Sequence, residues 1–131
     1  MPQTGLAVLA VLSLASCLHP AEAVHIVPVP PNPPVGQTVT LSVRDIEHPT
    51  ICFWFRGNKF NKSQMIIQVE YGRVVQRGGG ATGRESLGND CALVIQRLQP
   101  SDNGEYYLVT LQGNRSGQRW TDALARLQVS N

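Results

Sequence analysis

Few side chains of this sequence stand in arrangements that could do chemistry. Residues 78–85 have the spacing of a phosphate-binding loop, but Arg84 and Glu85 replace the Lys and Ser/Thr that would hold phosphate and Mg²⁺. This loop also precedes a strand pattern, whereas phosphate loops open helices. His25 and His48 lie far apart without metal-ligand spacing, and the carboxylates form no pair suited to acid–base work. We therefore expect a protein that is not an enzyme and uses no cofactor or metal.

The first 23 residues have the features of a cleavable export signal. A short apolar stretch, residues 5–18, is followed by Ala21-Glu22-Ala23, which is typical of a cleavage site. The stretch is shorter than the roughly 20 apolar residues that a bilayer span needs, and no second such stretch follows. We therefore predict a signal peptide over 1–23, one domain over 24–131 and no membrane span in this chain. The protein is expected outside the cell, either secreted or held at the surface by an anchor beyond this sequence.

Two cysteines of the predicted domain could form a disulfide. Cys17 leaves with the signal peptide, so that Cys52 and Cys91 remain as an even pair in an exported chain. Cys52 shares its strand parity with Trp54, and Cys91 shares its parity with Leu93, which directs both thiols into a core. A bridge is therefore one hypothesis, and two small buried thiols are the alternative.

The charge pattern argues against nucleic acid as a partner. The chain has 11 Lys and Arg against 9 Asp and Glu, a formal net charge of +2. The basic residues are scattered singly, without a run and without an interleaved aromatic platform. We expect no nucleic-acid binding.

The hydrophobic pattern of the sequence predicts short β-strands. Val39, Leu41 and Val43 alternate with Thr and Ser, as in a half-buried strand. Further strand candidates, each bounded by turn residues, are 51–55, 65–69, 93–98, 106–108 and 127–129. The prolines of 28–34 indicate an edge strand or its lead-in. Many short strands and no helical period favour an all-β sandwich or barrel.

Four residues narrow this architecture to an immunoglobulin V-type sandwich with Greek-key connections. Tyr106 follows Asp102 by four residues at the entry of a late strand, which is the spacing of a tyrosine corner. Trp54 lies on the strand where such sandwiches bury a tryptophan. Arg84 precedes Asp102 by 18 residues, which suits the salt bridge that closes the bottom of V-type domains.

The usual inter-sheet disulfide of immunoglobulin domains is missing. Val43 and Leu108 occupy the two positions that would carry its cysteines. Its loss forgoes about 2–4 kcal/mol of stability, which apolar packing of these two side chains can partly offset.

The sequence resembles the amino-terminal domain of the carcinoembryonic-antigen-related cell adhesion molecule (CEACAM) family. The motifs that carry the resemblance are Gly36-Gln-Thr-Val-Thr-Leu-Ser-Val43, Trp54-Phe-Arg-Gly57, Gln64-Met-Ile-Ile67, Gly83-Arg-Glu85, Leu93-Val-Ile-Gln96 and Asp102-Asn-Gly-Glu-Tyr-Tyr-Leu108. The resemblance implies a V-type domain without the inter-sheet disulfide. The pair of Cys52 and Cys91 departs from these domains, and residues 113–122 are expected to form a longer final loop.

Strand parity predicts an apolar outer face on one sheet. If Trp54 points into the core, Phe53 and Phe55 point outward from the same strand. The outward residues of the late strand are then Tyr107, Val109 and Leu111, while Phe60 and Met65 belong to the adjoining hairpin. An apolar face on an exported domain marks an interaction site. The alternative is that this strand packs under a neighbouring loop or domain.

The family resemblance implies adhesion through the same face, the sheet of strands G, F, C and C′ in V-type domains. The expected partner-binding residues are Phe53, Phe55, Phe60, Met65, Val109 and Leu111, with Asp122 as a matching acidic position. We predict that Phe55→Arg abolishes binding and leaves the fold intact. The expected partners are proteins, in homophilic contacts (a possible homodimer) or heterophilic contacts with immunoglobulin-like receptors.

Two sequons predict N-glycans, at Asn61 and Asn114. A glycan on Asn61 would lie at the rim of the proposed face, beside Phe60, and could block self-association. The first functional hypothesis is an adhesion or recognition module. The alternatives are a soluble effector or decoy that acts on cell-surface receptors, as in the secreted pregnancy-associated branch of the family, and a matrix component that polymerises through this face.

Overall fold

The computed structural model describes residues 23–131. The predicted signal peptide lies outside the described residues, except for Ala23. No helix among the described residues is long and apolar enough to cross a membrane.

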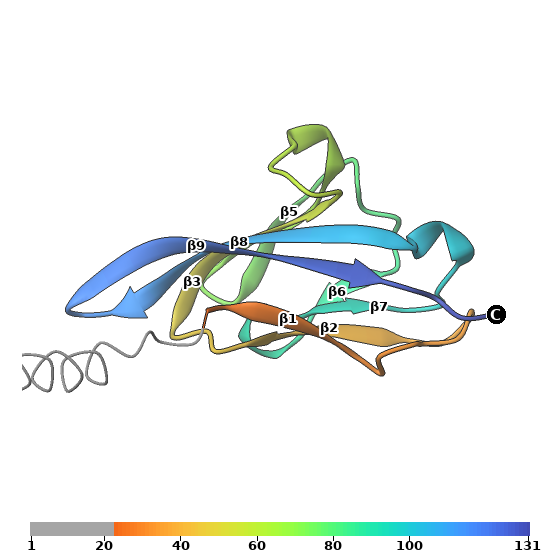
Figure 1. Ribbon diagram of the computed structural model, residues 1–131. Coiled ribbons are helices and arrows are strands. Elements are labelled where there is room, and N and C mark those ends of the chain that lie inside the picture. The colour runs from red at the N-terminus through yellow and green to blue at the C-terminus, as the bar shows by residue number, and fades with distance from the viewer. Residues whose placement is uncertain (1–22) are drawn as a thin grey trace, which may run out of the picture.

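The described chain forms two β-sheets packed face to face (Figure 1). The strands are β1 (His25–Val29), β2 (Val39–Arg44), β3 (Pro49–Arg56), β4 (Met65–Glu70), β5 (Arg73–Arg77), β6 (Glu85–Leu87), β7 (Leu93–Ile95), β8 (Gly104–Asn114) and β9 (Gly117–Leu127). Short 3₁₀ helices are η1 (Lys62–Gln64), η2 (Asn89–Cys91) and η3 (Pro100–Asp102). One sheet has the strand order β1-β2-β7-β6 and the other the order β5-β4-β3-β8-β9. This arrangement confirms the predicted V-type sandwich.

The core between the sheets is built by the alternation seen in the sequence. On β2, Val39, Leu41 and Val43 are buried while the threonine and serine between them are half-buried. Leu108 is also fully buried in this core, so that Val43 and Leu108 fill the inter-sheet space as apolar side chains. Trp54 is fully buried, and its indole nitrogen donates a hydrogen bond to the carbonyl of Cys91 at 2.8 Å.

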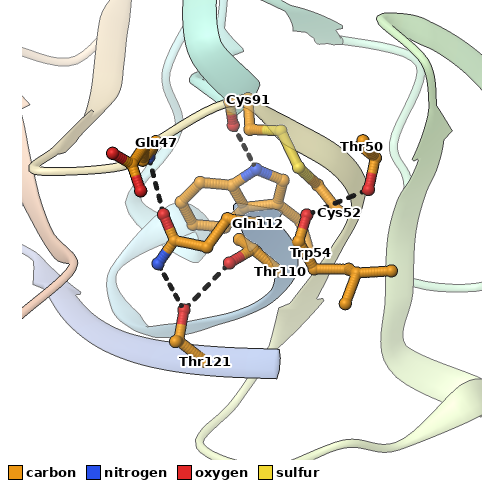
Figure 2. Close-up of a disulfide and its surroundings, with 9 residues drawn as sticks. Glu47, Thr50, Cys52, Trp54, Cys91, Thr110, Gln112 and Thr121 are labelled. Atoms are coloured by element: carbon orange, nitrogen blue, oxygen red, sulfur yellow. Dashed lines mark hydrogen bonds between the residues drawn. A yellow bond between two sulfur atoms is a disulfide. The ribbon is translucent and has the colours of Figure 1, made fainter. Parts of the chain in front are cut away.

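A disulfide joins Cys52 on β3 to Cys91 at the end of η2 (Figure 2). The hypothesis of a bridge is therefore confirmed. Since η2 leads into β7 of the four-stranded sheet, the bridge ties the two sheets together beside Trp54, at a place different from the usual inter-sheet position.

A buried polar cluster holds the long β8–β9 hairpin to the loop after β2 (Figure 2). The side-chain oxygen of Gln112 accepts a hydrogen bond from the backbone N–H of Glu47 at 2.6 Å. Its amide nitrogen donates to the hydroxyl of Thr121 at 3.2 Å, and that hydroxyl lies 3.0 Å from the hydroxyl of Thr110. Gln112 and Thr110 are fully buried, so these bonds satisfy groups that would be costly to leave unpaired.

The opposite end of the sandwich is closed by the predicted ion pair and tyrosine corner. Arg84 donates two hydrogen bonds to the carboxylate of Asp102, at 2.8 and 2.9 Å. The Tyr106 hydroxyl donates to the Asp102 carbonyl at 2.6 Å. A second ion pair, which was not predicted from the sequence, joins Arg56 to the buried Glu85 at 2.5 Å.

These buried groups titrate away from their ordinary values. Burial favours a higher pKa for Asp102, but hydrogen bonds from Arg84 and from the Gln99 N–H, with the charges of Arg84 and Arg56, hold its pKa below 3.8. Burial also opposes ionisation of Glu85, and hydrogen bonds from Thr82 with the charge of Arg56 lower its pKa below 4.5. Burial raises the pKa of Tyr106 to about 12.

The expected loop over 113–122 is wrong. These residues complete β8 and begin β9, which pair from Gly104↔Leu127 to Asn114↔Gly117. The hairpin tip extends beyond the start of β3, where Pro49 pairs with Gln112 (Figure 1). The segment 113–122 is rich in polar residues, a composition that is typical of loops. Pairing between β8 and β9 nevertheless makes most of it strand. The short strands β5 and β6 were not predicted either.

Candidate protein-binding face

Three neighbouring strands place alternate side chains on the surface of the five-stranded sheet that faces away from the core. We call this surface the outer face. Its side chains form three rows across β3, β8 and β9: Ile51, Leu111 and Trp120; Phe53, Val109 and Asp122; Phe55, Tyr107 and Leu124. The residues between them on β3 and β8, Cys52, Trp54, Leu108 and Thr110, are buried. Phe53 and Phe55 alternate with the core residues Cys52 and Trp54, and they therefore point away from the core, as predicted.

An aromatic cluster covers the centre of the outer face. The ring of Phe53 lies between Phe60 and Trp120, with ring centroids 5.7 and 6.4 Å away. Phe55 lies 4.5 Å from Phe60 and 6.3 Å from Tyr107. Such separations suit favourable edge-to-face and offset contacts. The cluster therefore joins β3, β8 and β9 to the loop that carries Phe60.

The expectation that Phe55 meets solvent is wrong. Its side chain is 0% exposed, although it points to the outer face, because Phe60 folds back over it from the loop after β3. Met65 pairs with Phe55 across β3 and β4 and is only 8% exposed. An arginine at position 55 would have to be buried, so Phe55→Arg would disturb the fold as well as any binding. Phe55 therefore packs under the neighbouring loop, which was the alternative to an exposed strand, and Met65 is buried as well.

The accessible apolar surface is contributed by other residues. Phe60, Trp120 and Leu124 are 53%, 55% and 50% exposed. Phe53, Val109 and Leu111 are half-buried between them. Trp120 and Leu124 were not predicted from the sequence, although their spacing around Asp122 has the period of two that marks one face of a strand.

The loop that carries Phe60 is held by close backbone packing. Asn61 caps η1, since its side-chain oxygen accepts hydrogen bonds from the backbone N–H and the hydroxyl of Ser63, at 3.1 and 2.8 Å. A Cβ on Gly78 would lie 2.6 Å from the carbonyl oxygen of Met65, and a Cβ on Gly79 would lie 2.6 Å from the carbonyl oxygen of Ser63. Neither position has room for a side chain. The glycines at 78–80, which have the spacing of a phosphate loop, therefore allow their backbone to pack directly against residues 63–65, the segment that follows Phe60.

The two predicted glycosylation sites lie at opposite ends of the face. Asn61 is half-buried beside Phe60, near the end of β3. Asn114 is exposed at the turn of the β8–β9 hairpin, where its side-chain oxygen accepts a hydrogen bond from the N–H of Ser116 at 2.9 Å. Glycosylation of either residue stays a prediction.

One carboxylate lies within the apolar surface. Asp122 accepts a hydrogen bond from the Tyr107 hydroxyl at 2.5 Å, and this bond raises the pKa of Tyr107. A shallow depression of about 240 Å³ opens beside it, with Tyr107, Val109, Trp120, Thr121 and Asp122 as its lining. Among residues 23–131, no three His, Cys, Asp or Glu side chains gather as a metal site would require. The surface is suited to contact with another molecule.

The two-sheet topology, the tyrosine corner and this exposed sheet face define the class of the protein. The sequence matches the immunoglobulin V-set domain family over residues 26–130, and the chain belongs to that family.

Within this class, similar proteins include CEACAMs and a pregnancy-specific glycoprotein. Cell adhesion molecule CEACAM16 of Mus musculus is 38% identical over 114 residues, which cover 84% of this chain and 25% of that protein. Pregnancy-specific glycoprotein 22 of Mus musculus is 33% identical over 108 residues, 78% of this chain and 22% of that protein. The chain thus spans about a quarter of the length of these relatives.

Solved structures agree with this relationship. Murine CEACAM1b superposes with a TM-score of 0.72 at 25% identity, over 82% of this chain and 54% of that one. A mouse coronavirus receptor-binding domain complexed with its murine receptor contains a chain that matches with a TM-score of 0.68 at 25% identity, over 81% of this chain and 53% of that one. The resemblance to the CEACAM family seen in the sequence is therefore confirmed.

Proposed function

We propose that this V-set domain is an extracellular recognition module that binds protein partners, in cell adhesion, through its outer face. The observation that carries the proposal is that Phe60 and Trp120, each about half exposed, lie beside the half-buried ring of Phe53, while the half-exposed Leu124 shares the outer side of β9 with Trp120. Large exposed apolar patches on soluble domains mark interaction sites, and aromatic side chains dominate binding energy there. The names of the relatives, cell adhesion molecules, support the same class of function.

The buried part of the aromatic cluster supports this role in a different way. Phe55 is buried against Phe60, and its cross-strand neighbour Met65 is buried as well, so the surface that a partner meets rests on packed side chains before binding. A preorganised surface loses less side-chain entropy on association. The binding residues that we now propose are Phe53, Phe60, Val109, Leu111, Trp120 and Leu124, with Phe55 and Met65 as supporting residues.

The test replaces exposed side chains and leaves the buried Phe55 and Met65 unchanged. Trp120→Arg and Leu124→Arg place a charge on the outer face, and Val29→Arg makes the same change at a 46% exposed valine of the other sheet. Binding of the labelled, secreted domain to mammalian cells is measured by flow cytometry, and self-association by sedimentation velocity. We expect the two outer-face variants to lose at least about tenfold in binding, as for interface hot spots, and the Val29 variant to behave like the wild type.

Equal thermal unfolding midpoints would show that all three variants fold. The proposal is wrong if the wild-type domain neither binds cells nor self-associates, or if the outer-face variants match it.

The second candidate, a soluble effector or decoy, would use the same outer face. It is supported by the 33% identity with pregnancy-specific glycoprotein 22. Expression of the complete gene in mammalian cells separates the two functions, since an adhesion molecule stays at the cell surface while an effector accumulates in the medium.

A further inference from the structure

The depression on the outer face has two aromatic walls and one carboxylate. In the strand register, Val109 and Asp122 form the row between Trp120 on one side and Tyr107 on the other. Trp120, Tyr107, Val109 and Asp122 all line the depression, whose volume is about 240 Å³. Its lining therefore combines two aromatic rings, the side chains of Val109 and Thr121, and one carboxylate on β9.

The carboxylate of Asp122 has no cationic partner within the described chain. One of its oxygens, Oδ2, accepts the hydrogen bond from the Tyr107 hydroxyl at 2.5 Å. None of the ion pairs among residues 23–131 includes Asp122. The second oxygen is not engaged by any described hydrogen-bond donor. A negative charge thus lies on the outer face without an ion-pair partner among the described residues.

The aromatic walls are also open to a cation. Trp120 stacks on Phe53 with an interplanar angle of 30°, yet remains 55% exposed. The only cation that lies over an aromatic ring in residues 23–131 is Arg56 over Tyr106, in a different part of the domain. The exposed indole is therefore available for a cation–π contact.

We propose that this depression receives an arginine side chain of the protein partner. The inference rests on the proposed function, because it names the chemistry that the partner presents to the outer face. A guanidinium group is planar, weakly hydrated and always charged, so it can stack on Trp120 and donate to the free oxygen of Asp122 together. The ammonium of lysine is compact and strongly hydrated, and it gains less from an indole face.

The experiment titrates the secreted domain with N-acetyl-arginine amide and follows tryptophan fluorescence at constant ionic strength. The chain has two tryptophans, and Trp54 is fully buried, so the response reports on Trp120. N-acetyl-citrulline amide is the neutral, planar control, and N-acetyl-lysine amide is the charged, non-planar control. We expect a saturable change with arginine, a weaker one with lysine and none with citrulline.

Variants show where the probe binds. Asp122→Asn keeps an acceptor for the Tyr107 hydroxyl and removes the charge, so we expect arginine to bind about threefold more weakly, as for an exposed ion pair. Glu70→Gln removes another carboxylate of the same sheet, outside the depression, and leaves arginine binding unchanged. Trp120→Phe removes the fluorescence change.

Equal responses to citrulline and arginine, or an unchanged affinity in Asp122→Asn, would overturn the inference. A domain that binds cells and ignores arginine overturns the arginine site and leaves the proposed function standing. A domain that responds to arginine but binds no cell surface and does not self-associate overturns the proposed function, and with it the arginine-bearing partner.

Discussion

Removal of the disulfide between Cys52 and Cys91 is expected to destabilise the domain strongly. The two cysteines are 39 residues apart in sequence, and both are buried in the core beside Trp54. Because the usual inter-sheet positions hold Val43 and Leu108, this bridge is the disulfide that cross-links the two sheets in the described chain. Its main effect is to restrict the unfolded chain, which has fewer conformations when a loop is closed.

The chain-entropy relation gives the size of this effect. A closed loop of 39 residues corresponds to about 4 kcal/mol at 25 °C. Loss of the buried sulfur of either cysteine adds to that figure. A domain of this size has a total stability of about 5–15 kcal/mol, so a large fraction depends on the bridge.

The assay is urea unfolding of Cys52→Ala, Cys91→Ala and the double variant, followed by tryptophan fluorescence. Either single change removes the same bond, so each should lower the free energy of unfolding by about 4 kcal/mol. The double variant should then cost little more than a single one, and far less than the sum of the two. Additive costs, or single variants that lose less than about 2 kcal/mol, would refute the reasoning that the cross-link, and not local packing, carries the stability.

Two further predictions follow from burial and charge. Phe55→Ala should lower the free energy of unfolding by about 3–5 kcal/mol, as for a buried phenylalanine. Phe60→Ala should lower it by only about 1 kcal/mol, because about half of this residue is already exposed. Equal losses for the two variants in denaturant unfolding would contradict the packing described here. The pKa values of Asp102 and Glu85 lie below 3.8 and 4.5 in the folded state, so their contribution to stability is complete above these values and is lost as the pH falls through the folded pKa values. The thermal unfolding midpoint should therefore drop in acid, and less steeply in Asp102→Asn; a midpoint that does not change between about pH 6 and about pH 3 would disprove this linkage.

Much of the fold could be predicted from the sequence because its signals are local or depend on fixed spacing. The alternation of Val39, Leu41 and Val43 identifies a half-buried strand without knowledge of its neighbours. The spacing of Asp102 and Tyr106 identifies the corner, because the tyrosine hydroxyl bonds back to the carbonyl four residues upstream. The outward direction of Phe53 follows from the position of Trp54, because side chains alternate along any strand.

Exposure on the outer face depended on tertiary structure. Phe55 has the same parity as Phe53, yet Phe60 covers it, and only the path of the loop over 57–64 decides this. That path in turn depends on the glycines at 78–80, which lie against the loop and far from it in sequence. Parity determines the side of a sheet to which a residue points, and it carries no information about what is packed above it.

The sequence by itself therefore determined the class of fold, the residues of the core and the side of the sheet on which an apolar surface would form. Tertiary structure alone decided that Cys52 meets Cys91 and that Trp120 and Leu124 join the surface. The physical reason is that strand direction is a property of neighbouring residues in the chain. Disulfide partners and solvent exposure, in contrast, are set by contacts between segments that the sequence keeps far apart.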